Sequence, residues 1–148
     1  MKRGILFRGK DTDTGRWYEG FYMALSDTTY CFKEDYDRHP DNTKHYIVFD
    51  QMTDWCLPNR HLQAEVDPTT VGQYTGLNDK NGKRIFDGDI VRHYNNERDP
   101  SAFEIGVICW NEKYASFERT SSPEAVRVHS SCRYDVIGNI HDNHDLLE

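Results

Sequence analysis

Asp87 and Asp89 are the two acidic side chains whose spacing best fits shared acid–base chemistry. Two carboxylates brought into one cleft separate their pKa values, so that one donates a proton while the other accepts it. Gly88 stands between them and favours a tight turn that leads into a strand, because Asp and Gly are typical turn residues. We expect the pair to shape the backbone, and we retain both residues as candidates for ligand binding.

A short polar segment, Gln73-Tyr74-Thr75, lies between Gly72 and Gly76. Neither a lysine nor a helix start follows the glycines, so the segment does not match a phosphate-binding loop. The glycines instead indicate a close approach of two backbones. Gln73, Tyr74 and Thr75 are therefore candidate binding residues, and a partly buried aromatic ring is the alternative role for Tyr74.

The carboxyl-terminal segment carries His141, Asp142, His144 and Asp145, whose side chains are good ligands for zinc and related metals. The spacing fixes no third ligand, so we predict no metal and no other cofactor. A metal-dependent hydrolase that uses these residues remains an alternative function. No catalytic residue is assigned, because the partners of a Ser-His-Asp or Cys-His site meet only in space.

The four cysteines are far apart and show no paired spacing, which is typical of separate thiols in a reducing cytoplasm. They are Cys31, Cys56, Cys109 and Cys132.

The charge of the chain argues against nucleic acid as a partner. The net charge is −7, and residues 65–148 hold fifteen acidic and nine basic residues. Nucleic-acid-binding proteins normally present a basic face, whereas the local basic excess here is a small group near the amino terminus. Three tryptophans are candidate platforms for stacking bases, but without a cationic groove we expect them in cores or interfaces: Trp17, Trp55 and Trp110.

The first part of the chain reads as a series of strands. Residues 4–9 and 16–25 flank a segment of turn-forming residues and predict a hairpin, and residues 29–32 and 46–49 predict two further strands. Residues 34–44 are polar without periodicity and predict a loop. A proline among turn-forming residues at 66–70 predicts a boundary, which divides the chain into portions 1–65 and 66–148.

The second portion predicts a small barrel. Asn81-Gly82 is the pair preferred in type I′ hairpins, because both central positions need positive φ. Five short strands follow, and such a set favours a small SH3-like barrel, whose closure removes exposed edges. Their expected ranges are 90–94, 103–110, 115–119, 126–129 and 134–140. The predicted fold class is mainly β, with a β-rich α+β fold as the alternative.

Three separated blocks carry a family resemblance. The central block is residues 71–92, VGQYTGLNDKNGKRIFDGDIVR; a basic and aromatic pattern at 7–20 precedes it, and residues 136–147 follow it. With these blocks in this order, the chain resembles the YopX family of phage and prophage proteins. The resemblance implies a phage or prophage protein with a β-rich, barrel-like fold, and it implies no particular activity.

The sequence has no apolar run of about 18 residues, the length that a membrane-spanning helix needs. The apolar segment near its first residue is too short for a signal peptide. We expect a protein of the bacterial cytoplasm without a membrane partner. The predicted function is non-enzymatic binding or assembly, with self-association into a homo-oligomer or with a phage or host protein as partner. A nucleic-acid-binding barrel and a metal-dependent hydrolase are the alternatives.

Overall fold

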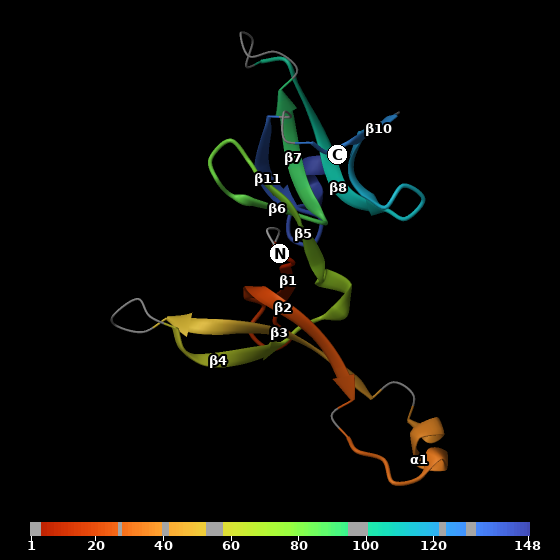
Figure 1. Cartoon of the computed structure of the whole chain (residues 1–148). Helices are drawn as coiled ribbons and strands as arrows, with labels where there is room; N and C mark the ends of the chain where they lie inside the picture. The colour runs from red at the N-terminus through yellow and green to blue at the C-terminus, as the bar shows by residue number, and fades with distance from the viewer. Residues whose placement is uncertain are drawn as a thin grey trace. The chain divides into compact units, whose positions relative to one another are not determined.

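The computed structural model describes residues 4–26, 28–39, 42–52, 58–94, 101–121, 124–129 and 133–148 (Figure 1). The chain divides into two compact units, an amino-terminal unit of Leu6–Val71 and a carboxyl-terminal unit of Gly72–Glu148 with Met1–Ile5. The boundary that we placed near residue 65 lies a few residues before this division. Both units consist mainly of antiparallel strands, so the fold class is mainly β.

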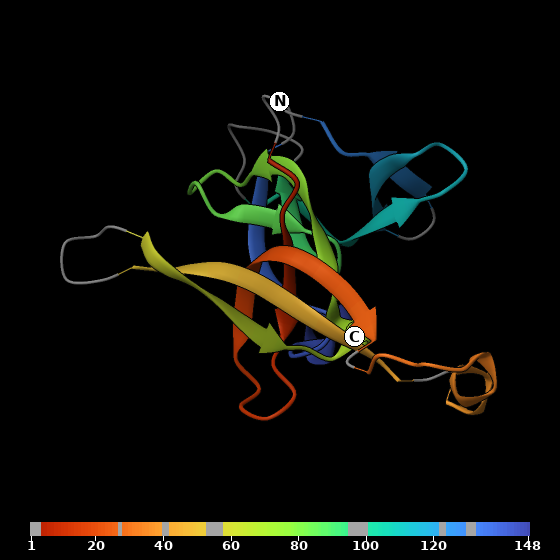
Figure 2. The same ribbon diagram turned by 60° about the horizontal axis from the view of Figure 1, so that its bottom comes forward.

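Among the described residues of the amino-terminal unit, four strands pair antiparallel in the order β4-β3-β2-β1. They are β1 (Phe7–Lys10), β2 (Trp17–Ser26), β3 (Thr43–Met52) and β4 (Pro58–Glu65), and the short helix η1 (Pro68–Thr70) follows them. Figure 2 shows the long, twisted hairpin of β2 and β3. The predicted hairpin of 4–9 and 16–25 is confirmed, and the strand predicted at 46–49 is part of β3.

Two local predictions for this unit are wrong. Residues 29–32 do not form a strand, and the predicted loop at 34–44 contains the helix α1 (Lys33–Arg38) and the beginning of β3. The helix is only six residues long and buries none of them, so it has no apolar periodicity by which to recognise it. Its own charges support it instead, because Lys33 pairs with Asp37 at 3.7 Å and Arg38 pairs with Asp35 at 3.3 Å.

One face of this sheet is tightly packed. Tyr22, Ile47 and Ala64 are in register across β2, β3 and β4, and Ile47 is completely buried. Position 20 on this face is occupied by glycine, because a Cβ atom there would overlap the carbonyl oxygen of Val48. The opposite face of β2 carries the exposed Phe21.

Seven strands lie in the described part of the carboxyl-terminal unit. A hairpin of β5 (Gly72–Asn78) and β6 (Arg84–Phe86) precedes a five-stranded antiparallel sheet of order β10-β9-β8-β7-β11. The sheet strands are β7 (Asp89–Tyr94), β8 (Phe103–Asn111), β9 (Ser116–Ser121), β10 (Glu124–Arg127) and β11 (Tyr134–Asn139), and the short helix η2 (His144–Leu147) ends the chain. A strand is therefore present at each of the five expected places, although the one expected at 126–129 lies at Glu124–Arg127.

The core of this unit joins the hairpin to the sheet. Ile85 of β6 packs with buried residues of the sheet, namely Val91, Ile108, Phe117 and Tyr134. Among the described residues, the sheet ends at β10 on one side and at β11 on the other, and these two strands do not pair. The expected closed barrel is therefore not observed. The four-residue strand β10 pairs with β9 alone, which leaves the sheet open.

Candidate interaction surface

The turn at Asn81-Gly82 joins β5 to β6 and differs from the predicted type I′ geometry. Only Gly82 has a positive φ, +84°, whereas the type I′ turn needs positive φ at Asn81 as well. The Gly82 N–H donates to the Asp79 carbonyl at 3.0 Å, and the Asp79 N–H donates to the Lys83 carbonyl at 2.7 Å. This is the pattern of a three-residue loop in which Gly82 supplies the left-handed position.

Asp79 organises this turn and is a residue that the sequence analysis missed. Its buried carboxylate accepts the backbone N–H groups of Asn81 at 2.8 Å and Lys83 at 2.9 Å on one oxygen, and that of Val136 at 3.2 Å on the other. Burial raises the pKa of Asp79, but hydrogen bonds from Lys83, Val136 and Asn81 outweigh burial and lower the pKa below its ordinary value. An aspartate two residues before an Asn-Gly pair is the sequence signal for this role.

The Asp87-Gly88-Asp89 segment forms a tight turn. Gly88 has a φ of +80°, and its N–H donates to the carbonyl of Ile108 at 2.8 Å. Asp89 is buried, and its carboxylate accepts the N–H of Phe86 at 2.8 Å. The backbone N–H of Asp87 donates to the carbonyl of Gln73 at 2.9 Å. The turn that the sequence predicts is present.

The other candidate residues make contacts within the β5–β6 hairpin. The ring of Tyr74 lies 5.6 Å from that of Phe86, and its hydroxyl donates to Asn78 at 2.7 Å. The hydroxyl of Thr75 donates to the carbonyl of Ile85 at 2.9 Å. These contacts stabilise the hairpin, and a binding role for Gln73, Tyr74, Thr75, Asp87 and Asp89 stays a prediction.

The segment around η2 is held by Asn139. Its side-chain oxygen accepts the N–H groups of His141 at 2.9 Å and Asp142 at 3.0 Å, and His144 is exposed. In the described part of the chain, no three His, Cys, Asp or Glu side chains gather as a metal ion would need.

The thiols and indoles lie in both units. Cys31 is exposed and Cys109 half-buried, both free, whereas Cys56, Cys132 and Trp55 lie outside the described residues. The guanidinium of Arg8 lies 5.0 Å from the ring of Trp17, and Trp110 packs edge-on against Phe117 at 5.0 Å.

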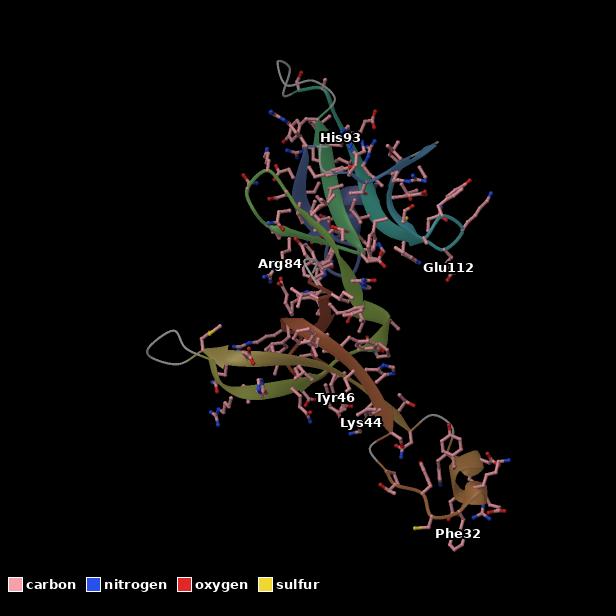
Figure 3. The ribbon with its side chains drawn as sticks, viewed as in Figure 1. Phe32, Lys44, Tyr46, Arg84, His93 and Glu112 are labelled. Atoms are coloured by element: carbon pink, nitrogen blue, oxygen red, sulfur yellow. The ribbon has the colours of Figure 1, made fainter. Side chains whose placement is uncertain are left out.

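The amino-terminal unit presents an apolar sheet surface, which we call the outer face. Phe21, Met23 and Leu25 alternate along β2 and share one face, and Val48 and Tyr46 of β3 lie opposite Phe21 and Met23. Phe21 is 66% exposed, Leu25 is exposed, and the other three are half-buried. In Figure 3, Tyr46 and Lys44 mark this stretch of β3.

The connection between β2 and β3 also carries exposed apolar side chains, and we call residues 28–39 the arm. Figures 1 and 2 show α1 beyond the ends of both strands. Phe32 is 67% exposed, and Figure 3 shows it beside α1 at the far end of the arm. Tyr36 is exposed and packs edge-on against Tyr30 at 5.6 Å, and Tyr30 accepts a hydrogen bond from Asn42. The arm is thus ordered by polar and aromatic contacts while its apolar groups face water.

No helix of the described residues is both long enough and apolar enough to cross a membrane.

Comparison with known proteins gives a family and a fold. The family model described as YopX protein matches residues 6–148. The crystal structure of protein EF1440 from Enterococcus faecalis is similar, with 22% sequence identity and a TM-score of 0.52, over 99% of this chain and 100% of that chain. At this identity the similarity shows the fold alone. No curated protein matches the chain.

Proposed function

We propose that this chain, which belongs to the YopX family, is a phage- or prophage-encoded binding or assembly protein without enzymatic activity. It acts in the cytoplasm of the bacterial host and associates with further copies of itself. The observation that carries the proposal is the apolar outer face and arm of the amino-terminal unit. A phage or host protein that covers the same surface is the other partner that this function allows.

Several large apolar side chains of the amino-terminal unit are exposed on the outer face and the arm. Single exposed apolar residues are normal, whereas neighbouring ones on one face mark a contact site. Phe21 and Leu25 are exposed on one strand, and the arm adds the exposed Phe32 and Tyr36. Burying one large apolar side chain contributes about 1.5–3 kcal/mol, so a few of them supply much of a stable interface.

Symmetry makes a second copy a suitable occupant. In a two-fold dimer, the same patch covers itself, so one apolar surface is enough for association. The net charge of −7 makes two copies repel each other at long range. Added salt screens this repulsion and does not weaken apolar contacts. Association that strengthens with sodium chloride is therefore the expected behaviour.

The strand connectivity of the carboxyl-terminal unit is compatible with a binding module. Strands β7 to β10 form a meander in which each strand pairs with the next, and β11 returns to pair with β7. This connectivity supports an SH3-like arrangement whose barrel is not closed. Folds of this kind host many functions, so the arrangement supports a binding module without naming its ligand.

A nucleic-acid-binding barrel is the second candidate, because cations lie over aromatic rings on this unit. Lys80 is 4.4 Å from the ring centre of Tyr94, and Arg92 is 4.5 Å from that of Phe103. Asp135 lies 3.1 Å from Lys80 and offsets its positive charge, which weakens the attraction of this surface for phosphate groups. Nucleic-acid binding therefore ranks behind self-association. Fluorescence anisotropy with labelled single-stranded DNA tests the alternative, and binding that weakens steeply with salt would support it.

The test of self-association is the mass of the protein in solution. Size-exclusion chromatography with light scattering is expected to show an oligomer for the wild type and a monomer for the double variant Phe21→Ser/Leu25→Ser. Val126→Ser removes an exposed apolar side chain from the carboxyl-terminal unit and serves as the matched control, which stays oligomeric. A wild type that is monomeric at micromolar concentration, or a control that dissociates equally, would refute the proposed surface.

A further inference from the structure

Arg119 is a cation in the interior of the carboxyl-terminal unit. It lies on β9 opposite Ile108 of β8, which is completely buried, and the side chain of Arg119 is only 3% exposed. Its Nη2 contacts the Glu104 carboxylate at 2.8 Å, and the Glu104 side chain is 47% exposed. The ion pair thus joins a buried guanidinium to a carboxylate that borders solvent.

The neighbouring strand provides the room for this cation. A Cβ atom on Gly106 would lie 2.8 Å from Cγ of Arg119, so a side chain at this position would press on the arginine stem. Gly106 and Glu104 alternate on the same face of β8. The aliphatic stem of Arg119 therefore packs beside Gly106. Its guanidinium reaches the carboxylate of Glu104, two residues before Gly106 on β8.

Glu104 uses only part of what the guanidinium offers. Arginine presents five N–H donors in a planar fork, and each of its two bidentate edges includes Nη2. Nε and Nη1 are buried, and neither has a hydrogen-bond partner among the described residues. Buried donors without partners are costly, so a ligand that engages a whole edge gains free energy that Glu104 leaves unused.

Further donor-bearing side chains lie across the sheet from Glu104. His93 of β7 is its direct cross-strand neighbour, and Tyr134 of β11 is the neighbour of His93 on the other side, with the two rings 5.4 Å apart. Directly paired residues share one face of a sheet. Figure 3 shows His93 on β7, within the carboxyl-terminal unit. This end of the sheet face therefore combines one acid with an arginine, a histidine and a tyrosine.

We propose that Arg119 anchors a binding site for a small oxyanion, either a phosphate or a carboxylate group, and that Glu104 occupies this site as a displaceable internal carboxylate. Both ligand groups present two oxygens that fit one edge of the guanidinium. Because the Glu104 side chain is partly exposed to solvent, it has room to move away from Nη2 of Arg119. The site lies in a different unit from the outer face and does not depend on self-association.

The test removes the internal competitor and keeps its shape. In Glu104→Gln, inorganic phosphate or acetate, titrated at constant ionic strength, is expected to bind at least about tenfold more tightly than in the wild type. Glu112→Gln changes an exposed acid in the loop between β8 and β9, labelled in Figure 3, and is the matched charge control with no gain. Binding is measured by calorimetry and by NMR shifts of the Arg119 side chain.

The two anions separate the two sources of the group. Tighter binding of phosphate alone, of acetate alone or of both supports the site and identifies the group that it takes. No gain for either anion, or an equal gain in Glu112→Gln, overturns the proposal. If Glu104→Gln does not fold, wild-type titrations decide, since phosphate or acetate must shift the Arg119 side-chain resonances of the folded protein, and absence of any shift overturns the proposal.

Discussion

Replacement of Asp79 by asparagine tests how the turn between β5 and β6 is attached to β11. In the wild type, one carboxylate oxygen accepts two N–H groups and the other accepts the N–H of Val136. Asparagine keeps one acceptor oxygen and replaces the other by an NH₂ group. In its better orientation it retains the two bonds within the turn and sets a donor against the N–H of Val136.

The expected cost follows from this count. A hydrogen bond to a charged group contributes about 1.5–3 kcal/mol, and Asp79→Asn loses one such bond and the charge on the other two. We predict that the free energy of unfolding falls by about 2–3 kcal/mol at neutral pH. Asp145→Asn changes an exposed carboxylate of η2 and is the control, with an expected change within about 0.5 kcal/mol.

Acid provides a second readout of the same interaction. The pKa of Asp79 in the folded protein is lowered from 3.8, so the stabilisation is fully present above that value and is lost as pH falls through the folded pKa. The difference between wild type and Asp79→Asn in urea unfolding must therefore shrink below about pH 4. Equal stability at neutral pH, or a difference that does not change on acidification, would refute the role assigned to Asp79.

Three further predictions concern backbone geometry and one surface pair. Gly82→Val is expected to lower the free energy of unfolding by more than about 1 kcal/mol, because φ is +84° at this position. Gly82→Asn is expected to lower it by less, because asparagine tolerates the left-handed region better. Equal urea midpoints for the wild type and the valine variant would contradict this. Gly20→Ala is expected to cost more than about 2 kcal/mol because its Cβ overlaps the Val48 carbonyl, and a thermal melt like that of the wild type would exclude the overlap. Hydrogen bonds from Lys80 and, to a smaller extent, Arg92 lower the pKa of Tyr94, so Lys80→Met is expected to raise this pKa. An ultraviolet titration measures it, and Tyr94→Phe identifies the signal. If the pKa does not rise in Lys80→Met, Lys80 is not the cause.

The strands of the carboxyl-terminal unit were predictable from the sequence, but the buried face of the sheet was not. Phe103, Ile105, Val107 and Cys109 of β8 alternate with Glu104, Gly106, Ile108 and Trp110, a pattern typical of a strand with two different faces. Phe103 and Ile105 of the first set are exposed, whereas Gly106 and Ile108 of the second set are buried. A buried arginine from β9 needs the space that Gly106 leaves, and this requirement depends on strand pairing that the sequence of β8 does not contain.

Turn chemistry was predictable in its position and only in part in its geometry. The sequence correctly places turns at Asn81-Gly82 and at Gly88. The type I′ geometry is wrong because the buried carboxylate of Asp79 binds the N–H groups of the loop and fixes a three-residue turn. The helix α1 was not predicted because it buries no side chain and therefore shows no apolar periodicity. Its stabilising contacts are local charge pairs, such as Lys33 with Asp37.

Sedimentation equilibrium of the wild-type protein, at low and high concentrations of sodium chloride, measures self-association through the amino-terminal unit. We expect a mass that is a whole multiple of the chain mass at micromolar concentration, and association that strengthens as salt screens the net charge of −7. A single species with the mass of one chain at every concentration and salt level would contradict it.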